Sequence, residues 1–212
     1  FTTLDMKIAQ VLLSLDNMLE RKQYENARST FNALLSRHII PIVNENDTVA
    51  VQDVKFGDND TLSAHVAALV NADYLFLLTD VDGLYTCNPF KNPDAKLISV
   101  VENVEDLDVS TDGAGTELGT GGMATKLTAA RYATSAGVNT VILNSSHMNK
   151  VLSVVEGASV GTLFLAMPKP LQGRKRWILL QPCCGKVYVT KIAMNAIEKD
   201  NSLFAAGIIS CD

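Results

Sequence analysis

Long apolar runs and an excess of positive charge are both missing from this sequence of 212 residues. No apolar stretch approaches the roughly 18 residues that a membrane-spanning helix requires, and the first ten residues lack the basic and then apolar pattern of a secretory signal. The net charge of −5 argues against nucleic acid or an anionic membrane as a partner. These absences lead us to expect a cytoplasmic protein that does not bind membranes.

Cysteine and histidine are also scarce, with four and three residues. The cysteines form no CxxC pair, and the histidines lie far apart without metal-ligand spacing. We therefore expect reduced thiols and no structural metal site. The chain opens without methionine, directly on a helical pattern, and it ends straight after an apolar run. We expect a fragment of a longer protein.

Apolar spacing along the chain alternates between the periods of helices and strands. It predicts helices around 8–19, 24–35, 61–72, 122–136 and 148–157, with strands at 38–43, 74–79 and 138–144. YLFLLT (74–79) is an unbroken apolar run, which is typical of a strand covered on both faces. The alternation predicts an α/β domain with a mostly parallel sheet, although three strands are few for such a domain.

A run of prolines and charges, PKPLQGRKR (168–176), predicts a linker after this domain. Beyond it, WILL (177–180) and GKVYVT (185–190) have the pattern of strands, and IAMNAIEKD (192–200) that of a short helix. This tail is too short for a complete domain, so we expect the beginning of one.

Polar or glycine-rich segments follow the predicted strands or precede the predicted helices. They are NEND (44–47), FGDND (56–60), TDVDGLY (79–85) and GTGG (119–122). In parallel α/β sheets, ligands bind beyond the carboxyl ends of the strands. We therefore predict that these four segments converge on one ligand site.

Each segment also has an explanation without a ligand. Asp58, Asn59 or Asp60 can simply cap the following helix, Gly83 can belong to a tight turn, and Lys126 can be a surface lysine. A calcium loop is not indicated, because DVDG lacks the later ligands of an EF-hand. The glycine-rich segment is not a P-loop either, since its fifth position after Gly119 is alanine. A phosphate would have to be held by the helix start, its glycine amides and the lysine.

Four longer segments contain these motifs in order: IPIVNENDTVAV, KFGDNDTLSA, LFLLTDVDGLYTCNP and GTGGMATKLTAA. Together they resemble the glutamate 5-kinases, a group within the amino acid kinase family. Aspartokinase, carbamate kinase and acetylglutamate kinase share the architecture but not NEND together with GDND. The resemblance implies a three-layer αβα sandwich that lacks its N-terminal portion (1–166), a linker (167–176) and the start of a small β-rich PUA-like domain (177–212).

The resemblance also implies an activity, namely the ATP-dependent phosphorylation of the side-chain carboxylate of L-glutamate in proline biosynthesis, with Mg²⁺ accompanying ATP. By matching motif positions, Asp47 and Asn59 would bind glutamate, Lys126 would be catalytic and Asp60 would orient it. The nucleotide would be held by Thr79, Asp80, Thr120, Gly121, Gly122, Met123, Ala124, Thr125 and Lys126. Proline would be a feedback inhibitor and the enzyme a homo-oligomer.

Two alternatives stay open from the sequence. One is another amino acid kinase, of the aspartokinase or acetylglutamate kinase type. The other is an RNA-binding role of the PUA-like segment with the basic run Arg174-Lys175-Arg176, although a solvated linker explains that run as well. The family's N-terminal strand, with its phosphate loop and lysine, has no counterpart in this chain. We expect these 212 residues alone to be inactive.

Overall fold

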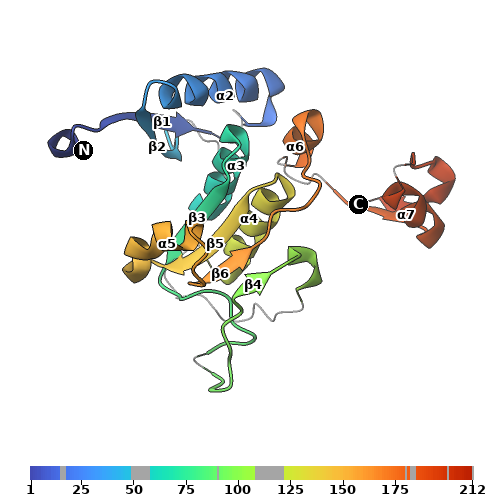
Figure 1. Cartoon of the computed structure of the whole chain (residues 1–212). Coiled ribbons are helices and arrows are strands. Elements are labelled where there is room, and N and C mark those ends of the chain that lie inside the picture. Colours follow the sequence, from blue (N-terminus) through green and yellow to red (C-terminus); the bar gives the residue numbers. More distant parts are fainter. Residues whose placement is uncertain are drawn as a thin grey trace. The chain divides into compact units, whose positions relative to one another are not determined.

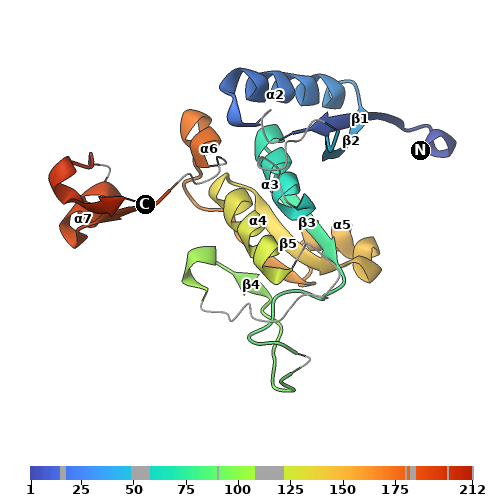
Figure 2. The same cartoon turned by 180° about the vertical axis from the view of Figure 1, so that it is seen from behind.

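The computed structural model describes residues 1–14, 18–48, 58–89, 91–107, 122–179, 181, 185–199 and 201–211. It divides the chain into two compact units, Phe1–Leu180 and Gln181–Asp212. Within the described residues, no helix has the length and apolar character needed to cross a lipid bilayer. Figures 1 and 2 show the chain from opposite sides.

The first unit contains six strands and five helices among its described residues. The strands are β1 (Lys7–Leu13), β2 (Ile39–Glu45), β3 (Tyr74–Thr79), β4 (Val100–Val101), β5 (Asn139–Asn144) and β6 (Thr162–Phe164). The helices are α2 (Arg21–Leu35), α3 (Asn59–Val70), α4 (Met123–Ser135), α5 (Val151–Val155) and α6 (Gly173–Leu179). Short 3₁₀ turns lie at Thr2–Leu4, Val104–Asp106 and Ser145–Lys150.

The larger sheet has the strand order β3-β5-β6-β4. Strands β3 and β5 run parallel, with Tyr74 opposite Asn139 and Thr79 opposite Asn144, and β6 is antiparallel to β5. Helices α3 and α4 lie side by side on one face, where Ala64, Ala129 and Ile142 are fully buried (Figure 1). Helix α5 packs on the other face through Val154. Helices therefore cover both faces of a mostly parallel sheet, and the predicted α/β fold is confirmed.

The segment predicted as the first helix is instead strand β1, and this prediction was wrong. Ile8, Val11 and Leu12 fit a helical spacing, but β1 pairs in parallel with β2 along its whole length. Val11 packs under α2 on one face of this two-stranded sheet, whereas Ile8 and Leu12 are exposed on the other. Pairing with a neighbouring strand decides the conformation of such a short apolar run. Among the described residues, β2 pairs with no strand other than β1. It is therefore an edge strand, where a proline such as Pro41 is tolerated.

The prediction of a strand at WILL was also wrong, because Trp177, Ile178 and Leu179 belong to helix α6. The indole of Trp177 donates a hydrogen bond to the carbonyl of Met18 at 3.0 Å and packs against the core under α2. Contacts distant in sequence thus fix this segment, and a four-residue apolar run cannot reveal them.

The second unit contains β7 (Val187–Val189), α7 (Lys191–Glu198), a 3₁₀ turn (Ala205–Gly207) and β8 (Ile208–Cys211). Strand β7 pairs antiparallel with β8, and Thr190 caps α7 by accepting a hydrogen bond from the Ala193 amide at 3.2 Å. The predicted strand and helix in this tail are confirmed. The described residues of this unit include none that is buried.

Candidate functional site

The first turns of α3 and α4 lie at the carboxyl edge of the larger sheet. Each helix leads through a short turn into the parallel strand that follows it, and the chain reverses direction at that turn. The start of each helix therefore lies near the carboxyl end of the strand that follows it. Asn71 adopts a left-handed conformation at the end of α3, and Gly137 does so after α4 (φ 53° and 92°). Left-handed residues commonly end helices. Two helix starts and two strand ends thus meet at one edge.

Helix α3 begins with a side-chain cap. The carboxylate of Asp58 accepts hydrogen bonds from the amide of Thr61 at 2.7 Å and from its hydroxyl at 2.9 Å. Asp58 is therefore the capping residue among the three polar residues considered from the sequence. Asn59 and Asp60 occupy the first turn and keep their side chains for other contacts.

Asp60 and Lys126 form an ion pair between the two helices. The Lys126 Nζ lies 3.0 Å from Asp60 Oδ2, and the two side chains are only 10% and 19% exposed. The hydroxyl of Thr125 donates to the same oxygen at 2.9 Å. One carboxylate oxygen therefore holds both the lysine and the threonine. Lys126 is therefore buried, and the alternative interpretation of it as a surface lysine is wrong.

Helix α4 begins at Gly122, which has no side chain to cap it. The first backbone amide that bonds within the helix is that of Lys126, to the Gly122 carbonyl at 3.4 Å. Met123, Ala124 and Thr125 form the first turn, while Thr120 and Gly121 lie outside the described residues. A helix start without a capping side chain leaves amide donors for an anion.

Thr79 and Asp80 lie at the end of β3, as predicted. The Thr79 hydroxyl is 3.0 Å from Asp80 Oδ1. Asn144, at the end of β5, donates from its Nδ2 to the Asp80 carbonyl at 3.2 Å and to Asp82 Oδ1 at 3.0 Å. Tyr85 donates to the other oxygen of Asp82 at 3.3 Å. The pKa of Tyr85 is raised, first by burial and then by Asp82.

Asn144 and Asp82 were not among the predicted site residues. Asn144 ends VNTVILN just as Thr79 ends YLFLLT, so inspection of every strand end would have found it. Asp82 belongs to the segment TDVDGLY, in which the sequence indicated a tight turn at Gly83. Its role in fixing Asn144 depends on a contact between segments that are 62 residues apart.

Asn59 lines a cavity of about 550 Å³ between β2 and β3, with α3 as its floor. Asn44, the first residue of NEND, lines the same cavity. Asp47, the predicted partner of Asn59, is exposed beyond the end of β2 and is not among the lining residues. Strands β2 and β3 belong to separate sheets in the described residues. The expected single sheet edge is therefore divided at this point.

Apart from Asp47 and residues 122–124 at the start of α4, the predicted residues that the structure describes form three groups. Asp60, Thr125 and Lys126 are joined by direct contacts. Thr79 and Asp80 lie beside Asn144 at the strand ends. Asn59 faces the cavity on the β2 side of α3.

Sequence comparisons with a family model and with individual proteins both find similarity to amino acid kinases. The family model for amino acid kinases matches residues 1–144. Glutamate 5-kinase from Cyanothece sp. is 51% identical over 100% of this chain, and glutamate 5-kinase from Synechocystis sp. is 49% identical over 100%. The chain spans 59% and 58% of the lengths of these two relatives.

Solved structures show similarity of fold alone. An isopentenyl phosphate kinase in a substrate complex has a TM-score of 0.53 at 18% identity, over 77% of this chain and 62% of that one. UMP kinase from Bacillus anthracis has a TM-score of 0.52 at 17% identity, over 80% and 62%.

Proposed function

The chain belongs to the amino acid kinase family, and on this premise we propose that it is part of an enzyme that phosphorylates L-glutamate. The reaction transfers the γ-phosphoryl group of ATP to the side-chain carboxylate and gives L-glutamyl 5-phosphate, the first step of proline biosynthesis. Relatives named glutamate 5-kinase that are about half identical over the whole chain support this substrate. Aspartokinase-type and acetylglutamate kinase-type activities are the alternatives that a substrate assay must separate.

The observation that carries the proposal is the Asp60–Lys126 ion pair at the adjoining starts of two helices. Phosphoryl transfer needs alignment and charge neutralisation more than covalent help. A carboxylate substrate is already nucleophilic, so no general base is required. Lys126 would stabilise the negative charge that develops on the transferring group. Asp60 and Thr125 would hold the lysine in place.

The remaining residues would bind and orient the two substrates. The start of α4, from Thr120 to Lys126, would bind the phosphates of ATP, with Thr79 and Asp80 near the nucleotide. Asn59 offers both a donor and an acceptor to glutamate, and Asp47 would pair with its α-ammonium group. Asn44 shares the cavity of Asn59, and we add it as a contact to glutamate.

Magnesium would accompany ATP and neutralise charge on its phosphates when bound. Within the described residues, no three potential ligands cluster. This fits a cation that takes one or two carboxylates together with phosphate oxygens. Asp80 and Asp82 at the end of β3 supply carboxylates of that kind, and Asn144 fixes the orientation of Asp82.

Further properties of the whole enzyme belong to the same proposal. Proline would inhibit it at or near the glutamate site, the protein would form a homo-oligomer, and it would act in the cytoplasm. Residues 1–166 would form the kinase domain, 167–176 a linker and 177–212 the start of a PUA-like domain. Along the chain, the boundary between the two compact units falls between Leu180 and Gln181, a few residues beyond that linker.

Replacing Lys126 by alanine in the whole enzyme tests the proposal. The expected result is a fall in kcat of about 10²- to 10³-fold, the usual effect of removing one group that stabilises transition-state charge. The assay measures ADP release with glutamate, aspartate and N-acetylglutamate as acceptors. Lys169→Ala, at an exposed lysine after β6, is the control and should keep its activity. A normal kcat in the Lys126→Ala variant would refute the role of this lysine, and preference for another acceptor would refute the substrate.

A further inference from the structure

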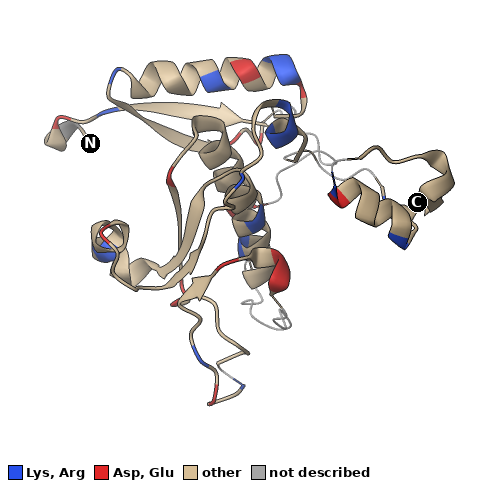
Figure 3. Ribbon diagram, turned by 45° about the vertical axis from the view of Figure 1, so that its right-hand side comes forward, with Lys and Arg blue, Asp and Glu red and all other residues tan. Residues whose placement is uncertain are grey.

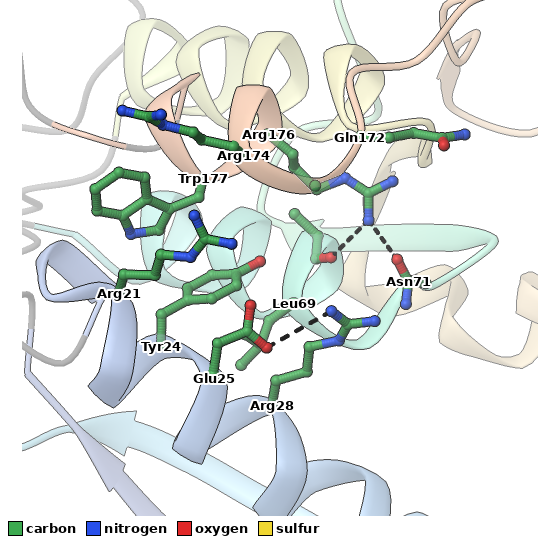
Figure 4. Close-up of a pocket in the computed structure, with 12 residues that line it drawn as sticks. Arg21, Tyr24, Glu25, Arg28, Leu69, Asn71, Gln172, Arg174, Arg176 and Trp177 are labelled. Atoms are coloured by element: carbon green, nitrogen blue, oxygen red, sulfur yellow. Dashed lines mark hydrogen bonds and ion pairs between the residues drawn. The ribbon is translucent and has the colours of Figure 1, made fainter.

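A second cavity, of about 320 Å³, lies between α2, the end of α3 and the segment that forms α6. Figure 4 shows Arg21, Tyr24, Glu25 and Arg28 projecting from α2 toward the opposite wall formed by Gln172 and the residues of α6. Arg21, Tyr24 and Arg28 are three and four residues apart, so they share one face of α2. The same cavity is lined by Arg174, Arg176 and Trp177.

The charge of this cavity contrasts with that of the chain. Four guanidinium groups line it against the single carboxylate of Glu25, while the whole chain carries a net charge of −5. Arg28 lies 3.8 Å from Glu25, both about half exposed. Among the described residues, neither Arg21 nor Arg174 forms an ion pair. Figure 3 shows basic positions at the start of α2 and on the neighbouring α6.

One wall of the cavity is fixed by hydrogen bonds. Arg176 donates to the Leu171 carbonyl at 2.9 Å, to the Ala68 carbonyl at 3.2 Å and to the Asn71 side chain. Trp177 is fixed by its bond to the Met18 carbonyl. These contacts occupy Arg176, whereas Arg21 and Arg28 project from α2 toward the cavity (Figure 4).

The floor of the cavity includes the buried side chain of Tyr24. Tyr24 is only 6% exposed, and burial raises the pKa of its phenol even though Arg176 and Arg28 act to lower it. A charge-assisted hydrogen bond is stronger beside buried protein groups, where the local dielectric constant is lower than in water. An anion seated against Tyr24 would therefore gain more from the guanidinium groups than it would on an open surface.

This cavity is separate from the candidate active site. It contacts the last turn of α3 at Ala68, Leu69 and Asn71, whereas Asp60 lies in the first turn. At the rise of an α-helix, Asp60 and Asn71 are about 16 Å apart along the axis.

We propose that this cavity is a binding site for a small, multiply charged oxyanion, held by Arg21 and Arg28 of α2 with Tyr24 and Gln172 beside them. The planar guanidinium group binds two oxygens of a phosphate or carboxylate at once, which suits this chemistry better than an ammonium group. The volume accommodates a molecule of the size of pyrophosphate or citrate.

The fluorescence of Trp177 provides the test, because it is the sole tryptophan of the chain and lines the cavity. The protein is titrated with pyrophosphate and, separately, with citrate, at constant ionic strength maintained with sodium chloride. We expect a saturable change in fluorescence. Arg21→Gln and Arg28→Gln should each raise the Kd about tenfold or more, as expected for losing a hydrogen bond to a charged group. Arg37→Gln, the same change of charge near the end of α2 and outside the cavity, should leave the Kd unchanged.

Three results would overturn the proposal. They are no saturable change with either anion at millimolar concentration, equal weakening by Arg37→Gln, or loss of binding in Lys126→Ala. The last would place the anion at the candidate active site instead. Tighter binding of pyrophosphate than of citrate identifies a phosphorylated ligand, and the reverse order identifies a carboxylate. Thermal unfolding of each variant checks that it is folded, and no step requires kinase activity.

Discussion

His65 is a titratable residue in the middle of α3 that the proposed chemistry does not use. It is 2% exposed, and its ring meets that of Tyr132 on α4 edge-on, with centroids 5.8 Å apart. Burial lowers the pKa of this histidine from 6.5 to about 4. The folded protein therefore keeps His65 neutral under conditions in which the unfolded chain binds a proton.

Stability should consequently fall as the pH drops below 6.5. The unfolded state binds more protons than the folded state between pH 6.5 and 4, so the free energy of unfolding should decrease by about 2 kcal/mol between pH 7 and pH 5. Urea unfolding followed by circular dichroism measures this. His65→Phe, which keeps a ring but cannot titrate, should reduce that dependence. His38→Asn, at an exposed histidine, should retain it. Equal slopes in wild type and His65→Phe would contradict the assignment.

Single residues differed in how far the sequence indicated their contacts. Lys126 and Asp60 were recognisable from motif positions, but their sharing of one oxygen with Thr125 was not, because that contact joins segments 65 residues apart. The placement of Asn44 opposite Asn59 likewise depends on how β2 and α3 pack. Residue types can indicate a chemistry, whereas their pairings require the fold.

The connection that leads into β6 contains a close backbone approach at Gly161. This glycine has φ +76°, and a Cβ there would lie 2.2 Å from the Ile142 carbonyl oxygen in β5. Both the left-handed conformation and the contact disfavour a side chain.

Gly161→Ala should therefore lower the free energy of unfolding by about 3 kcal/mol or more. Gly157→Ala separates the two causes, because Gly157 also has a positive φ (+103°) but nothing lies within 4 Å of its Cβ position. That variant should lose only about 1–2 kcal/mol. Chemical denaturation measures both free energies of unfolding. If Gly161→Ala and Gly157→Ala lose the same amount, the close approach to Ile142 does not constrain this position.

At the scale of elements, long and strongly patterned segments were predictable and short ones were not. β3 and β5 were found from their apolar runs, and α3 and α4 from their spacing. Strands β4 and β6 have only two and three residues, too few for a period to be recognised. For β1 and α6, the partner strand β2 and the anchoring of Trp177 determine the structure. The local sequence pattern reveals neither the pairing of β1 with β2 nor the hydrogen bond of Trp177.

Across the whole molecule, burial is very unevenly distributed. All the described residues that are buried lie in Phe1–Leu180, and the described part of Gln181–Asp212 has none. A unit of about 30 residues whose described part contains no buried core has little stability of its own.

Amide hydrogen exchange should reflect this difference. Amides of α7 and β8 should exchange at least about a hundredfold faster than those of β5, whose side chains from Thr140 to Leu143 are fully buried. Exchange followed by mass spectrometry of peptic fragments measures both regions in one sample. Comparable protection of the two would contradict the prediction and indicate that the second unit is stabilised by contacts of another kind.

Helix α3 contacts α2, α4, β2 and β3, with Asp60 in its first turn and the Ala68 carbonyl, which accepts from Arg176, in its last. A hydrogen-bonded helix of 12 residues moves nearly as a rigid rod, so a translation along its axis would displace both termini together. Occupancy at one terminus would then change affinity at the other, and thermodynamic linkage requires this effect to be equal in both directions.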